Sequence, residues 1–142
     1  MKILICESDP GHREGLQCLL SFMGYNVAVT QSGKEAIAIS KRRNQPIDLL
    51  ISELDLGDMP GTQVARKVSE AMPHVPVLFV STRPLDSNSA DARRRQRCPA
   101  AIDWLEKPFT VAALREKIGK LLRGFSKNHL MNRRLKRLPM AA

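Results

Sequence analysis

The chain has 142 residues and a formal net charge of +9, with 43% hydrophobic and 26% charged residues. That length suits one domain with one core, and the composition excludes a chain that is disordered throughout. No run of about 18 apolar residues occurs, and charged residues follow position 6 too early for a signal peptide. We therefore expect a cytoplasmic protein without a membrane segment.

The first half of the chain alternates short apolar runs with helical patterns. Residues 3–6 predict a buried strand, and the acidic, turn-forming residues 7–10 predict the loop after it. Apolar residues at helical spacing between 16 and 23 predict a helix that closes at Gly24. Residues 27–29 then predict a second strand, and a second helix begins at 32–35 and fades in the polar stretch 41–45.

The second half repeats the alternation. Residues 47–52 and 76–80 predict the third and fourth strands, with a helix over 64–72 between them. Residues 84–97 are polar and arginine-rich, which indicates a loop with a short, weakly amphipathic helix. Residues 101–105 predict a fifth strand, and apolar positions from 111 to 125 predict a final helix.

The order of these elements predicts a fold class. Strands that alternate with helices form βαβ units, and strands that are apolar throughout belong to a parallel sheet covered on both faces. The chain is therefore predicted to be a doubly wound α/β protein. In such folds ligands bind at the carboxyl ends of the strands.

Polar side chains follow the strands at that edge of the predicted sheet. They are Glu7, Ser8 and Asp9 after the first strand, Glu53 and Asp55 after the third, Ser81 after the fourth and Lys107 after the fifth. This arrangement over residues 1–125 resembles the receiver domain of two-component response regulators. The most specific matches are residues 48–54, Met59-Pro60-Gly61, residues 76–81 and residues 104–109.

The resemblance implies a five-stranded flavodoxin-like sheet in the order 2-1-3-4-5. It also implies a switch in which an aspartate at the end of the third strand accepts a phosphoryl group with help from Mg²⁺. By the same match Ser81 is the hydroxyl that moves toward the phosphoryl group, Lys107 is its cationic partner and Trp104 is the reorienting aromatic. The bond before Pro108 is expected to be cis.

Two residues depart from the family pattern at the reaction centre. Glu53 occupies the acceptor position, where its extra methylene shifts the carboxylate from attack geometry, and Ser8 replaces the second of the paired acids. The resemblance places a metal on Glu7, Asp9, Glu53 and Asp55, so we expect Mg²⁺ binding to be weak or lost. Asp9 is as well suited to cap the following helix as to bind metal.

These departures predict an atypical receiver, with no enzymatic activity, that regulates by protein–protein contact without conventional phosphorylation. Glu53 is then a permanent mimic of the phosphorylated state or an acid on an inert scaffold, and Lys107 is its salt-bridge partner. Residual Mg²⁺-dependent phosphorylation is the alternative. Expected partners are a sensor kinase, a downstream signalling protein, an effector domain in a longer chain or a second copy.

The last segment has a different character from the domain. Residues 126–142 contain five lysines and arginines and no acid, so more than half of the net charge of +9 lies there. We expect a domain over 1–125 and a basic tail or linker over 126–142, with nucleic-acid binding through the tail as an alternative function. Cys6, Cys18 and Cys98 are widely spaced, so we expect buried thiols without a metal or redox role. We expect the three histidines to lie at the surface.

Overall fold

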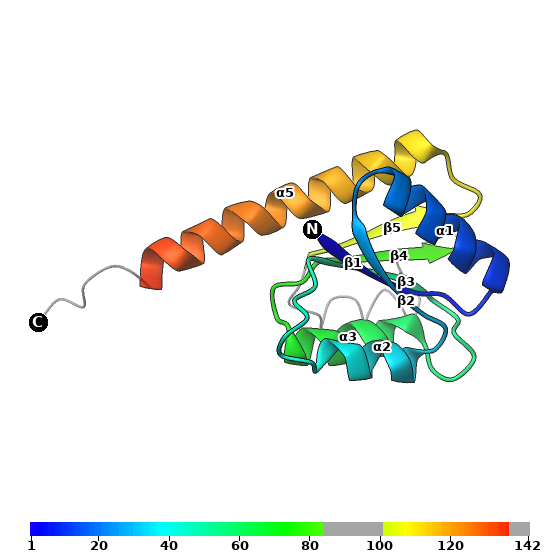
Figure 1. Ribbon diagram of the computed structural model, residues 1–142, viewed down its shortest axis with the longest axis horizontal. Helices are drawn as coiled ribbons and strands as arrows, with labels where there is room; N and C mark the ends of the chain where they lie inside the picture. Colours follow the sequence, from blue (N-terminus) through cyan, green and yellow to red (C-terminus); the bar gives the residue numbers. More distant parts are fainter. Residues whose placement is uncertain (84–100, 137–142) are drawn as a thin grey trace, which may run out of the picture.

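The computed structural model describes residues 1–83 and 101–136, with the backbone alone for 125–136. Five parallel strands form one sheet in the order β2-β1-β3-β4-β5 (Figure 1). They are β1 (Lys2–Cys6), β2 (Asn26–Thr30), β3 (Leu49–Glu53), β4 (Val77–Ser81) and β5 (Ile102–Glu106). Both the fold class and the strand order predicted from the sequence are confirmed.

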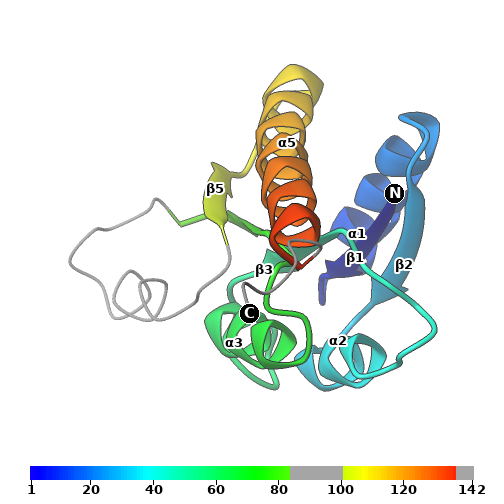
Figure 2. The ribbon, with the colours of Figure 1, turned by 90° about the vertical axis from the view of Figure 1, so that its left-hand side faces the viewer.

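Helices cover both faces of the sheet. They are α1 (Pro10–Phe22), α2 (Gly33–Ser40), α3 (Gly61–Ala71) and α5 (Val111–Lys136). Figure 2 shows α1 and α5 on one face and α2 and α3 on the other. The predicted short helix within 84–97 lies outside the described residues.

Each face of the sheet has its own apolar core. Side chains alternate along β1, so Ile3 and Ile5 pack with α1 and α5, whereas Leu4 and Cys6 pack with α2 and α3. All five residues of the central strands β3 and β4 are buried. Burial on both faces explains why these strands are apolar without alternation.

Side-chain caps fix the starts of α1 and α2 near the carboxyl edge of the sheet. The Asp9 side chain accepts a hydrogen bond from the His12 backbone N–H at 2.9 Å and so caps α1, as one of the two sequence readings expected. Ser32 caps α2 in the same way. The Asp58 carboxylate also accepts the N–H groups of Gly33 and Lys34 at 3.1 and 3.0 Å, which ties the β3–α3 loop to α2.

Several boundaries and one burial prediction differ from the sequence analysis. β3 begins at Leu49 because the Asp48 carboxylate turns to accept the Lys2 backbone N–H at 2.7 Å. α5 continues past residue 125 to Lys136, farther than the predicted end of the final helix. Cys18 is exposed, not buried, because it lies on the side of α1 opposite the buried Leu16 and Leu20. No described helix is long and apolar enough to cross a membrane.

Candidate functional site

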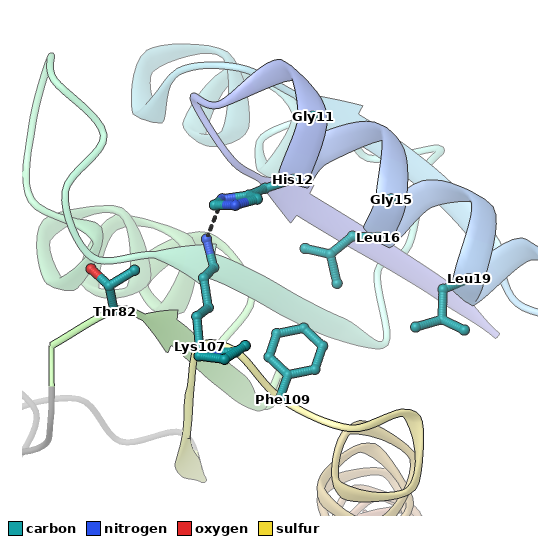
Figure 3. A pocket seen from close by; sticks show the side chains of 9 residues that line it. Gly11, His12, Gly15, Leu16, Leu19, Thr82, Lys107 and Phe109 are labelled. Atoms are coloured by element: carbon teal, nitrogen blue, oxygen red, sulfur yellow. Dashed lines mark hydrogen bonds between the residues drawn. The ribbon is translucent and has the colours of Figure 1, made fainter.

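Lys107 is the centre of the polar cluster at the carboxyl edge of the sheet. It follows β5, its backbone N–H donates to the Ser81 carbonyl at 2.7 Å, and its bond to Pro108 is cis, as predicted. The ammonium donates to Glu53 Oε2 at 2.5 Å and to Glu7 Oε2 at 3.1 Å. Its third contact is His12 Nδ1 at 3.1 Å, on the first turn of α1 (Figure 3).

We call Glu7, Glu53, Lys107 and His12 the Lys107 cluster. An ammonium has three protons and no acceptor, so the three contacts use its whole donor capacity and His12 Nδ1 must act as an acceptor. The side chains of Glu7, Glu53 and Lys107 are only 2%, 11% and 9% exposed. Two carboxyl groups therefore share one ammonium in this cluster.

Burial and pairing shift the pKa values of the cluster in opposing ways. Burial raises the pKa of the Glu7 carboxyl, and the hydrogen bond and charge of Lys107 only partly offset that rise. Burial alone would lower the pKa of Lys107, but the hydrogen bonds to Glu53 and Glu7 outweigh it and the pKa is raised. Lys107 is therefore held as a cation between the two acids.

Asp55 and Ser81, at the ends of β3 and β4, are linked through Arg83. The Arg83 guanidinium donates to both carboxylate oxygens of Asp55, at 3.2 and 3.3 Å. Its backbone N–H donates to the hydroxyl of Ser81, a residue that is fully buried, at 3.1 Å. Asp55 itself is exposed, so this bidentate pair is open to solvent screening.

These contacts decide how well the predicted Mg²⁺ ligands fit a divalent cation. Glu7 and Glu53 face the Lys107 ammonium, Asp9 caps α1, and Asp55 is paired with Arg83. Within residues 1–83 and 101–124 no three His, Cys, Asp or Glu side chains gather closely enough to hold a metal ion. A hard cation needs several free oxygen ligands at one point, so this arrangement does not fit Mg²⁺.

Trp104 belongs to the other face of the sheet. Its ring lies 5.9 Å from the Phe79 ring, centroid to centroid, at an interplanar angle of 56°. It packs against the core under α2 and α3, away from Lys107. The indole N–H is buried and has no hydrogen-bond partner in the described part of the chain. Its predicted switching role is not tested by this packing.

Sequence reasoning missed His12 and Arg83. His12 is exposed, as expected, but its contact with Lys107 across 95 positions of sequence was not foreseen. Its place in the first turn of α1, directly after the loop with Glu7 and Asp9, was the available signal. Arg83 lies two residues after Ser81, and nothing in the sequence pattern marked it.

Comparison with known proteins agrees with this architecture. The family model for the response regulator receiver domain matches residues 3–119. The response regulator MprA of Mycobacterium leprae is 32% identical over 123 residues, which are 87% of this chain and 51% of MprA. The transcriptional regulatory protein ZraR of Salmonella typhimurium is 29% identical over 120 residues, 84% of this chain and 26% of ZraR.

Solved structures give the same result. A receiver domain protein from Sinorhizobium medicae is 28% identical with a TM-score of 0.73, and the match covers 88% of this chain and 96% of that one. A CheY-like receiver from Methanospirillum hungatei shares the fold with a TM-score of 0.79 at 24% identity, over 89% and 97% of the two chains. This chain therefore belongs to the response regulator receiver domain family, and it spans between a quarter and about half of the length of the curated relatives named above.

Proposed function

We propose that this receiver domain regulates by protein–protein contact and is not phosphorylated at the usual acceptor position. The observation that carries the proposal is the 2.5 Å hydrogen bond from the Lys107 ammonium to Glu53 Oε2. In the family the lysine neutralises a phosphoryl group, whereas here its donors are satisfied by acids of the same chain. The Lys107 ammonium is thus already paired with acids in the absence of a phosphoryl group or a metal.

Three features together disfavour Glu53 as a phosphoacceptor. Its carboxylate is tied to the Lys107 cluster and one methylene longer than the family's aspartate, and small misplacements of a reacting atom are costly. Ser8 supplies no carboxylate. Glu7, which could have supplied one, is 2% exposed and engaged by Lys107. Phosphoryl transfer needs a cation at the developing charge, and these residues leave no set of free oxygens to hold it.

The Glu53–Lys107 pair also supports the idea that Glu53 mimics the phosphorylated state. Glu53 brings one negative charge to the lysine, while a phosphoryl group brings about −1.5 to −2 and three acceptor oxygens. The copy is therefore imperfect. Residual phosphorylation remains the competing function, and it requires the Lys107 cluster to open when Mg²⁺ binds.

The proposed partners follow from the family. A sensor kinase or a downstream signalling protein in the cytoplasm would bind the receiver surface, and no catalytic activity is proposed for the domain itself. MprA and ZraR are longer than this chain, so an effector domain in the same polypeptide is a further proposal. The basic segment 126–142 begins within α5, which is helical to Lys136. Nucleic acid is therefore an alternative partner of that segment.

A small phosphodonor tests the proposal directly. The chain is incubated with acetyl phosphate and Mg²⁺, and its intact mass is measured after brief handling at neutral pH. We expect no gain of a phosphoryl group, while an ordinary receiver domain in the same tube is modified. A gain in this chain that Glu53→Gln abolishes would show that Glu53 accepts phosphate and would overturn the proposal.

A further inference from the structure

A cavity of about 420 Å³ opens beside α1, next to the Lys107 cluster. Figure 3 shows it between α1 and the segment after β5, where Leu16 and Leu19 face Phe109 across the opening. Gly11 and Gly15 form its rim on α1. A Cβ added at Gly15 would meet no atom within 4 Å, so the helix backbone is open to a close approach there.

The row of α1 residues that borders this cavity also presents a large apolar side chain to solvent. Phe22, the last residue of α1, is 89% exposed. At 3.6 residues per turn, Gly11, Gly15, Cys18 and Phe22 fall in one row along the helix. α1 therefore carries a protruding ring at one end of this row and a hollow with a glycine rim at the other.

The low charge of α1 favours a contact between two copies at this face. The chain has a net charge of +9, so most approaches between copies are repulsive. α1 itself contains only Arg13 and Glu14 among the lysines, arginines and acids. The Arg13 guanidinium turns toward the chain and donates to the carbonyls of Glu7 and Ser8 at 3.1 and 3.2 Å.

We propose that α1 packs antiparallel against α1 of a second copy, so that each Phe22 enters the cavity beside Gly11 and Gly15 of the other. A two-fold axis pairs the Phe22 of each copy with the cavity of the other copy, so the same contact forms twice. The axis passes midway between Phe22 and the glycine pair, beside Cys18. The two exposed Cys18 thiols then face each other across it.

The size of this contact sets its strength. A single pair of helices 13 residues long buries less than the ~1,200–2,000 Å² of a specific stable interface. The dimer is thus weak and reversible, with a dissociation constant between about 10 μM and 1 mM. This inference does not depend on the state of Glu53.

Sedimentation of the whole chain tests the contact, with a matched pair of variants. Phe22→Glu should weaken the association by about tenfold or more, since it removes the inserted ring and would bring a carboxylate against the apolar side chains of the cavity. Ser21→Glu adds the same charge one residue away and off the row, and it should change the association less than about twofold. Phe22 is 89% exposed, so circular dichroism should show both variants folded. A chain that is monomeric at about 1 mM, or equal effects of the two variants, overturns the proposal.

Disulfide capture tests the position of the axis. In a Cys98→Ser background, two Cys18 thiols give up two protons and two electrons to diamide, which is reduced to its hydrazine. We expect a reducible dimer that Phe22→Glu suppresses. The control moves the thiol with Cys18→Ser and Glu14→Cys, whose two copies would lie roughly 10 Å apart along the axis, too far for a disulfide. Equal capture at both positions would mean random collision and would contradict the antiparallel arrangement.

Discussion

The Lys107 ammonium lies 2.5 Å from Glu53 Oε2, and the two side chains are only 9% and 11% exposed. A buried pair of this kind is costly to break from one side, because the remaining charge loses its partner without regaining water. The pair therefore links the end of β3 to the residue after β5 at the carboxyl edge of the sheet, and in the proposed function it engages the two residues that phosphoryl transfer would need.

The first prediction concerns the coupling between these two residues. A double-mutant cycle of Glu53→Gln and Lys107→Ala, read by urea unfolding, should give a coupling energy of about 1 to 3 kcal/mol. The control cycle uses Asp103→Asn and Lys117→Ala, whose side chains are 30% and 34% exposed, and should give about 0 to 1 kcal/mol. If the changes in unfolding free energy are strictly additive in the first cycle, Glu53 and Lys107 are not energetically coupled, and Glu53 is an acid on an inert scaffold.

The second prediction is a restoration of phosphorylation that needs two changes. Glu53→Asp alone should restore little phosphorylation by acetyl phosphate, because Ser8 still supplies no carboxylate for Mg²⁺. Glu53→Asp combined with Ser8→Asp should restore much more than the two single changes added together. The readout is the phosphorylated fraction by intact mass, and equal yields from Glu53→Asp alone and the double variant would show that Ser8 is not a limiting defect.

The third prediction is a pH dependence of stability from Asp58. Burial alone would raise the pKa of Asp58, but the N–H groups of Gly33 and Lys34 outweigh it and hold the pKa below its usual range. A carboxyl with a lowered folded pKa stabilises the fold above its unfolded value of about 3.9, and this contribution is lost as the pH falls through the folded pKa. The difference in unfolding free energy between the chain and Asp58→Asn should therefore be constant above about pH 5 and shrink on acidification below about pH 4. A difference that stays constant to pH 2 would exclude this role.

The fourth prediction concerns a close approach at the start of α3. A Cβ added at Gly61 would overlap the Glu53 carbonyl oxygen and lie 3.1 Å from Leu54 Cα, and both are backbone atoms that cannot swing aside. Gly61→Ala should cost about 1 to 3 kcal/mol of unfolding free energy. Gly15→Ala is the control, since it has open space and gains helix propensity, so it should be neutral or stabilising. Equal urea midpoints for the two variants would contradict this view of the β3–α3 junction.

The fold was predictable because continuous apolar runs mark the strands of a parallel sheet, and the family resemblance supplied their order. The Glu53–Lys107 pair was also predictable, from opposite charges at neighbouring strand ends. The roles of His12 and Arg83 were not, because they depend on side-chain directions across 95 and 28 positions of sequence. Cys18 shows a signal that was overlooked, since the spacing of Leu16 and Leu20 already places it on the opposite side of α1.

The length of α5 shows a different limit. The apolar pattern that faces the sheet ends near residue 125, and the prediction ended the helix there. The helix continues to Lys136 because residues 126–136 contain no glycine or proline and include several good helix formers. The apolar pattern therefore shows where packing against the sheet ends, whereas the backbone propensity of the following residues determines where the helix ends.

A crystal structure of the chain grown at high Mg²⁺ concentration tests the central claim most directly. We predict that Lys107 keeps its hydrogen bonds to Glu53 and Glu7 and that no octahedral ion appears at about 2.1 Å from their oxygens. The same experiment on the Glu53→Asp, Ser8→Asp double variant is the positive control and should show a bound ion. A Mg²⁺ ion held by Glu7, Glu53 and the backbone carbonyl of Asp55 in the unchanged chain, with Lys107 displaced from both acids, would contradict the account.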